Sequence, residues 1–150
     1  MKEILFKAKR KGRKDGTDYI SPYKNGDWVY GLITKQYKGH WVEEFDDEMT
    51  DENGVSGITI DRDTICEYTG LDDERGAKIF ENDIVLGRED NEEYVVVYVN
   101  GSFECFSLKT YGRIKTEVFI RKIITLNNVK RAVDNIYDRG GTVTVVDTIL

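Results

Sequence analysis

Apolar and polar residues alternate over short runs along this chain, and that period is typical of β-strands rather than of helices. Near the N-terminus, Ile4, Phe6 and Ala8 would share one face of a first strand, because successive side chains point to opposite faces. Similar runs, rich in aromatic and β-branched residues, predict further strands at residues 27–37, 40–44, 57–60, 64–68 and 140–146.

The clearest local signal is a hairpin. Two alternating runs, residues 94–99 and 102–108, flank Asn100-Gly101. Asn-Gly accepts the two positive φ angles of a type I′ turn, so the pattern predicts a β-hairpin here. The apolar positions of residues 113–138 fit both periods in part. We favour a strand, then a short helix or turn near Asn127, then another strand.

These elements predict a mainly β fold, all-β or α+β. We expect a small, partly barrel-like antiparallel sheet domain with hairpins and at most one or two short helices. A length of 150 residues is typical of one domain, so residues 1–150 should fold together. Two polar stretches interrupt the pattern, and we interpret residues 9–26 as a flexible basic loop and residues 45–57 as an acidic loop.

Composition is consistent with a packed core. Nine Tyr, six Phe and two Trp are too many aromatic residues for a disordered chain. The N-terminal apolar residues are soon interrupted by charge, so we expect neither a secretion signal nor a membrane span, and a protein that stays in the cytoplasm. Cys66 and Cys105 lack CxxC spacing, and we interpret them as reduced, buried residues.

The net charge of −6 conceals an asymmetry. Residues 1–40 carry ten Lys and Arg against four Asp and Glu, whereas residues 41–93 carry four against nineteen. Residues 94–150 are basic again, with eight against five. Opposite fields on one molecule can steer association, so we expect a homo-oligomer in which the basic N-terminal region faces the acidic middle of a neighbour. A basic arm folded back on the acidic loop would give the same pattern in a monomer.

A cationic cluster close to the N-terminus is the candidate nucleic-acid site. Tyr19 and Tyr23 follow it in the same segment, so phosphate contacts with base stacking are one interpretation. A solvated arm that only aids solubility is the alternative. The cluster consists of Lys7, Lys9, Arg10, Lys11, Arg13 and Lys14.

Catalytic and metal-binding patterns fail on spacing, so we expect no enzyme activity, no metal and no cofactor. His40 is the only histidine, and no nucleophile elbow accompanies it. No tight pairs of Cys and His occur, and the acidic run does not fit an EF-hand. Asp61 and Asp63 would share a face of an extended segment, which leaves paired-carboxylate catalysis as a weak alternative. A looser hard-cation cluster would use Glu43, Glu44, Asp46 and Asp47.

One segment is distinctive in its order and spacing. Tyr68-Thr69-Gly70-Leu71-Asp72-Asp73 is followed by Gly76 and then by residues 78–85, Lys-Ile-Phe-Glu-Asn-Asp-Ile-Val. This segment resembles the YopX-like proteins of bacteriophages and prophages, as do residues 2–8 and Asn135-Ile136-Tyr137. The chain departs from the family pattern at Asn82 and Asp134, where glycine is usual, and after Tyr137. The family-motif residues are Tyr68, Gly70, Leu71, Gly76, Asp83, Ile84 and Val85.

The chemistry of these motif residues favours a structural role over a functional one. Gly70 and Gly76 permit backbone angles closed to other residues, and Asn82 is the best substitute for glycine. Asp72, Asp73 and Asp83 should accept hydrogen bonds from backbone N–H groups in tight turns.

The resemblance implies a phage-encoded protein of unassigned role in the cytoplasm of a bacterial host. Our first hypothesis is a non-catalytic binding or assembly module that self-associates or binds a host or phage protein, with no membrane. The alternatives are a nucleic-acid-binding protein that uses the basic arm and, last, a metal-dependent enzyme that uses clustered carboxylates.

Overall fold

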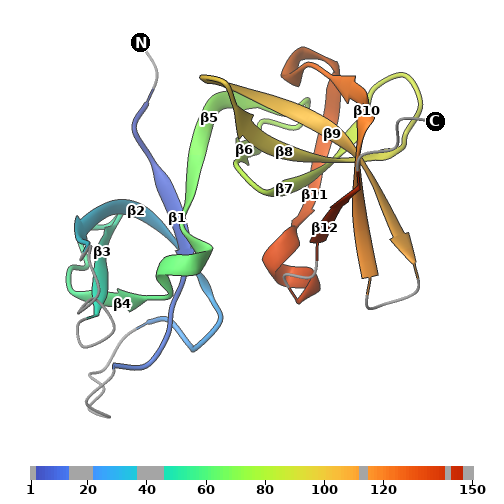
Figure 1. The fold of residues 1–150 in the computed structure, drawn as a ribbon. Helices are drawn as coiled ribbons and strands as arrows, with labels where there is room; N and C mark the ends of the chain where they lie inside the picture. The colour runs from blue at the N-terminus through green and yellow to red at the C-terminus, as the bar shows by residue number, and fades with distance from the viewer. Residues whose placement is uncertain (1–2, 14–21, 37–45, 112–114, 141–142, 147–150) are drawn as a thin grey trace. The chain divides into compact units, whose positions relative to one another are not determined.

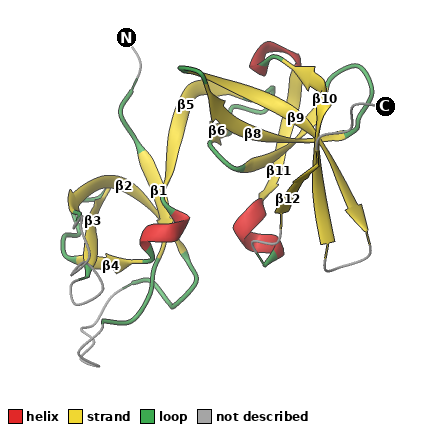
Figure 2. Ribbon diagram, in the orientation of Figure 1, coloured by secondary structure: helices red, strands yellow, loops and turns green. Residues whose placement is uncertain are grey.

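Strands dominate the structure, a computed structural model that describes residues 3–13, 22–36, 46–111, 115–140 and 143–146 (Figures 1 and 2). The mainly β prediction is confirmed, and the described helices are one-turn 3-10 segments. No helix in these ranges is long and apolar enough to span a membrane. The strands are β1 (Phe6–Lys9), β2 (Trp28–Lys35), β3 (Asp47–Asp51), β4 (Ile58–Ile60), β5 (Cys66–Asp72), β6 (Lys78–Phe80), β7 (Asp83–Gly87), β8 (Glu93–Val99), β9 (Ser102–Tyr111), β10 (Lys115–Ile124), β11 (Val129–Asn135) and β12 (Val143–Val146).

Contacts within the chain group into two compact units, residues 1–67 and residues 68–150. Strand β5 runs across the boundary, pairing with β1 at Cys66 and Glu67 and with β6 from Tyr68 onward. That all 150 residues fold as one domain stays a prediction.

The first unit is a small barrel. Strands β1 to β4 form an antiparallel series in the order β4-β3-β2-β1. A bridge between Arg10 and Ile60 joins β1 back to β4, supported by hydrogen bonds from the Asp61 N–H to the Lys9 carbonyl (2.8 Å) and from the Lys11 N–H to the Thr59 carbonyl (3.1 Å). The expected barrel-like character is therefore present in this unit. Its interior holds Ala8, Val29, Met49, Ile58 and Ile60.

The faces of the first strand differ at its start from those predicted. Phe6 and Ala8 contact the barrel core, but Ile4 is 71% exposed and Leu5 is buried instead. The reason is that β1 begins only at Phe6, so the alternation of a paired strand does not reach Ile4.

The acidic segment 45–57 is not a continuous loop, which corrects the prediction, because it contains β3. In this strand Asp47, Met49 and Asp51 all lie on the buried face. Groups from other parts of the sequence pair with the buried carboxylates. A guanidinium nitrogen of Arg62 lies 3.5 Å from Asp47 Oδ1, and the Tyr23 hydroxyl donates to Asp51 (2.7 Å). Buried polar groups are tolerated when they are paired in this way.

The basic loop also begins later than predicted. Lys9 belongs to β1, the Arg10 N–H donates to the Asp27 carbonyl (2.9 Å), and the Gly26 N–H donates to the Arg10 carbonyl (2.8 Å). These backbone hydrogen bonds tie both ends of the segment to the barrel. Residues 14–21 of the predicted loop lie outside the described residues, as do His40 and the predicted strand at 40–44.

The second unit contains a six-stranded sheet in the order β11-β7-β8-β9-β10-β12. The sheet is antiparallel except that β12 runs parallel to β10. The predicted hairpin is confirmed, since β8 pairs with β9 and both turn residues have positive φ, 50° at Asn100 and 86° at Gly101. The described part of the segment 113–138 also follows the prediction, with β10, a 3-10 turn (η3, Leu126–Asn128) and β11 in succession.

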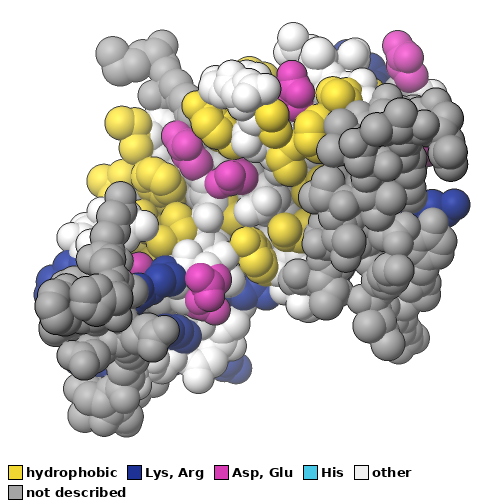
Figure 3. Space-filling view, in the orientation of Figure 1, with side chains coloured by type: hydrophobic (Ala, Val, Ile, Leu, Met, Phe, Trp, Pro, Cys, Tyr) yellow, Lys and Arg dark blue, Asp and Glu magenta, His cyan; other side chains and the backbone are white. Residues whose placement is uncertain are grey.

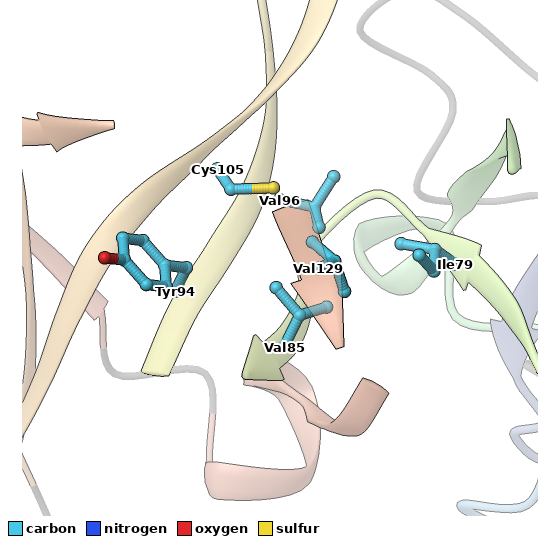
Figure 4. Close-up of a cluster of buried hydrophobic side chains, with 6 residues drawn as sticks. All are labelled: Ile79, Val85, Tyr94, Val96, Cys105 and Val129. Atoms are coloured by element: carbon cyan, nitrogen blue, oxygen red, sulfur yellow. The ribbon is translucent and has the colours of Figure 1, made fainter. Parts of the chain in front are cut away.

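Apolar side chains cover both faces of this sheet. Consecutive residues such as Val95 and Val96 belong to different core clusters, so the strands are buried on two sides. Burial raises the pKa of the Cys105 thiol to about 12, with a smaller effect from Glu104, and both cysteines are buried thiols as expected. Figure 4 shows one cluster, made by Ile79, Val85, Tyr94, Val96, Cys105 and Val129.

Candidate functional site

Residues 68–72 form the irregular second half of β5, where the register with β6 shifts, and they carry an exposed leucine. Gly70 adopts a φ of 90°, which favours glycine. The Thr69 hydroxyl donates to the Ile79 carbonyl (2.8 Å) and accepts from the Leu71 N–H (3.2 Å). The Tyr68 hydroxyl donates to the Asp72 carboxylate, so Asp72 binds a side chain rather than the backbone N–H we predicted. Leu71 itself is 42% exposed.

The next turn is organised by one buried carboxylate. Asp73 accepts hydrogen bonds from the N–H groups of Arg75 and Ala77 in its own turn, each at 2.9 Å, and from the Ala132 N–H of β11, also at 2.9 Å. Burial alone would raise the pKa of this carboxyl, but the backbone N–H groups outweigh burial and hold the pKa below its ordinary value. The predicted role of Asp73 is confirmed, and Gly76 closes the turn with a φ of 81°.

A second buried pair, Asp83 and Asn135, joins two motif segments that are far apart in the sequence. Asp83 accepts from the Phe80 N–H (2.8 Å) and from the Asn135 side-chain amide (3.0 Å). Asn82 has a φ of 66°, as expected of a residue that replaces glycine, and its carbonyl accepts from the Ile136 N–H (3.0 Å). The 80–85 step and Asn135-Ile136-Tyr137 therefore form one structural unit, in which Ile84 and Val85 enter β7 as predicted.

Asn135 also begins the 3-10 segment η4 (Ile136–Arg139). Its side-chain oxygen accepts from the Tyr137 N–H (3.0 Å), and its own N–H donates to the Asp138 carboxylate (3.1 Å). Every polar group of this fully buried side chain thus has a partner. Its burial could not be inferred from local pattern, although the resemblance had drawn attention to the residue.

Beside the motif turns lie two surface hollows that sequence reasoning did not find. The first, of about 180 Å³, is lined by Leu71, Asp72, Asp73, Glu74, Arg88, Leu126, Asn127 and Val129. The second, of about 160 Å³, is lined by Gly87, Arg88, Glu89, Asp90, Tyr94, Ile123, Ile124 and Asn128.

Arg88 lines both hollows, so they are neighbours. Its Nε donates to a Glu74 carboxylate oxygen at 2.7 Å, and its backbone N–H donates to the Asn128 carbonyl at 2.7 Å. On the face shown in Figure 3, hydrophobic and acidic side chains are both exposed. The rim of each hollow carries a partly exposed apolar residue, Leu71 at 42% and Ile123 at 47%.

The six predicted nucleic-acid contacts do not form one exposed arm. Lys7 and Arg10 are buried in the first unit, and the ammonium groups of Lys7 and Lys9 lie over the Trp28 ring, 4.7 and 5.2 Å from its centroid. These lysines make cation–π contacts within the barrel. Lys11 and Arg13 are partly exposed, and Lys14 lies outside the described residues. Nucleic-acid binding stays a prediction.

The candidate catalytic carboxylates have a structural use. Asp61 caps the 3-10 segment η2 (Arg62–Thr64) by accepting from the Asp63 N–H at 3.1 Å. Glu43 and Glu44 lie outside the described residues, and Asp47 faces Arg62. Within the described ranges, no group of three or more His, Cys, Asp or Glu residues is placed to hold a metal ion.

Comparison with known proteins agrees with the motif geometry. No curated protein matches the chain. The family model described as YopX protein matches residues 19–141, which is most of the sequence and includes both halves of the Asp83–Asn135 pair. The chain therefore belongs to the YopX protein family.

Proposed function

We propose that the protein is a non-catalytic binding or assembly module, encoded by a phage or prophage and acting in the cytoplasm of the bacterial host. In this proposal the protein self-associates or binds a host or phage protein. Its contact surface is the second half of β5, residues 68–72, with the adjoining hollows.

One observation carries the proposal: the motif holds an apolar side chain in the solvent. Glycine geometry at Gly70 and the hydrogen bonds of Thr69 restrain the backbone around Leu71, yet Leu71 is 42% exposed. A backbone that is already ordered loses little entropy on binding, so an exposed apolar side chain that it carries can serve as a contact point.

The charge distribution supports self-association as one form of this function. Residues 1–40 are basic and residues 41–93, which include Leu71 and Arg88, are acidic. Opposite fields on one molecule favour a head-to-tail contact between copies, and that contact would weaken as salt increases.

The test compares two exposed apolar residues of the second unit. Leu71→Ser changes the exposed residue of β5, whereas Val133→Ser changes a residue of β11 that is similarly exposed, at 46%, and lines neither hollow. Light scattering at micromolar protein, in low and high salt, measures self-association. Capture from nuclease-treated host lysate on the immobilised proteins measures binding to other proteins.

We expect Leu71→Ser to lower the oligomer mass or to remove captured proteins, and Val133→Ser to behave as the wild type. A monomer mass for the wild type at both salts, together with identical captured proteins for all three, would overturn the proposal.

A further inference from the structure

The residues that line the two hollows beside Arg88 carry more negative than positive charge. Five carboxylates line them, against the single guanidinium of Arg88. That guanidinium is already bound through its Nε to Glu74. Two further cations lie nearby, Arg75 on the motif turn and Lys130 on β11, but neither lines a hollow, and the Lys130 ammonium contacts Asn91 at 3.2 Å. The five carboxylates belong to Asp72, Asp73, Glu74, Glu89 and Asp90.

Four of these five carboxylates lie at the surface. Asp73 is buried and satisfied by backbone N–H groups, but Asp72, Glu74, Glu89 and Asp90 are exposed. Asp90 accepts from the Tyr94 hydroxyl (2.6 Å) and from the Glu92 N–H (3.0 Å), which holds its carboxylate at the edge of the second hollow. A fixed carboxylate next to a recess attracts a cation more strongly than a mobile one, because less side-chain entropy is lost.

Apolar groups also line the same hollows. The first is lined by the buried Val129, the partly buried Leu126 and the exposed Leu71, and the second by the partly buried Ile124 and the exposed Ile123. Each hollow therefore combines apolar lining residues with carboxylates. A nucleic acid or an anionic ligand is disfavoured here, because the carboxylates would repel its phosphates.

We propose that these hollows bind an extended segment of a partner protein that alternates apolar and cationic side chains. Alternation is required because successive side chains of an extended segment point in opposite directions, so apolar groups can enter the recesses while lysine or arginine side chains reach the rims. This inference rests on the proposed function and specifies the chemistry of its partner.

The probe is a fluorescein-labelled peptide of four Lys-Leu repeats, followed by fluorescence anisotropy. Two control peptides replace every Leu with Ser or every Lys with Glu. The site variant Asp72→Asn with Glu89→Gln removes two exposed carboxylates from the hollows. The matched control, Asp63→Asn with Glu52→Gln, removes two exposed carboxylates from the first unit and changes the net charge equally.

We expect saturable binding of the Lys-Leu peptide that weakens about tenfold in the site variant and less than twofold in the matched control. Both control peptides should bind weakly. Equal weakening in the two variants would show general attraction to an acidic protein and would overturn the inference. Tight binding of the Lys-Ser peptide would overturn it too, because the recesses would then contribute nothing.

The outcomes separate this inference from the proposed function. If self-association or capture depends on Leu71 but the Lys-Leu peptide does not bind at the hollows, the function stands and the inference fails. If the peptide binds at the hollows while Leu71→Ser leaves self-association and capture unchanged, the proposed function fails. Displacement of self-association by the peptide would identify a second copy of the chain as the source of the cationic segment, and would support both.

Discussion

Both units are built mainly from antiparallel strands, but different interactions link those strands. In the first unit, backbone hydrogen bonds around Arg10 and Ile60 close a ring, and many side chains could occupy those positions. Buried carboxylates hold turns in both units: Asp73 accepts from the N–H groups of Arg75 and Ala77, and Asp51 accepts in the same way from those of Asn53 and Val55. The second unit adds the buried Asp83–Asn135 pair, which joins two motif segments that are far apart in the sequence. That pair requires particular residues, whereas a closed ring requires mainly a pattern.

Removing the buried amide at Asn135 should have the largest effect on stability. Asn135→Ala would remove the buried amide bound to Asp83 and the side-chain cap of η4, and we expect a loss of about 3 kcal/mol in the free energy of unfolding. Denaturant unfolding measures it, with exposed Asn127→Ala as the control. Equal stability of the two variants would contradict the idea that one side chain fastens this part of the unit.

In the first unit one weak point is the close approach of two strands at Gly31. A Cβ atom on Gly31 would lie 2.0 Å from the Thr50 carbonyl oxygen, so β2 and β3 would have to separate. We expect Gly31→Ala to cost about 2 kcal/mol of unfolding free energy. Gly12→Ala is the control, since a Cβ there meets nothing within 4 Å. If Gly31→Ala were as stable as Gly12→Ala, close strand packing would not be what limits this barrel.

A substitution in the hairpin turn should cost less stability than Asn135→Ala or Gly31→Ala. Gly101→Val forces a β-branched residue to a φ near 86°, and we expect a cost of about 1 kcal/mol. Thermal unfolding followed by circular dichroism measures the change, and Ser102→Val, on the adjoining strand, is the control. An unchanged melting temperature for Gly101→Val would argue against the type I′ turn.

Acid should lower the free energy of unfolding of both units. Near neutral pH this effect should be smaller than those of the three substitutions above. Asp51 in the barrel and Asp73 in the second unit both have a pKa below the ordinary value, because hydrogen bonds to each carboxylate outweigh its burial. A depressed folded pKa contributes stability that is complete above the unfolded pKa, near 3.8, and is lost as pH falls through the folded pKa.

The free energy of unfolding, measured with denaturant, should therefore change little between pH 7 and pH 5 and should be lower at pH 3. Asp73→Asn should reduce that loss, since the amide does not titrate. A variant with the same acid sensitivity as the wild type would mean that Asp73 does not contribute to it.

Several features could be predicted from the sequence because they depend on neighbours in the chain. Asn100-Gly101 determines its own turn, and Asn82 adopts the positive φ expected of a glycine substitute. The strand that begins at Asp83 and the strand–turn–strand order of residues 113–138 also follow from local patterns. The exposed fraction of Leu71 and the hollows beside it could not be inferred, since segments 71–74, 87–90 and 123–129 meet only in three dimensions.

The sequence by itself determined the turns, the β class and the family, since each depends on short-range order or on a motif. Tertiary structure alone decided which charged residues are buried. The sequence pattern assigned Asp47 and Asp51 to an acidic loop and Lys7 and Arg10 to a basic arm, yet all four are buried in the first unit. The physical reason is that a charged side chain can be buried only where partners lie close to it. For Asp47 and Asp51 those partners, Arg62 and Tyr23, come from other parts of the chain.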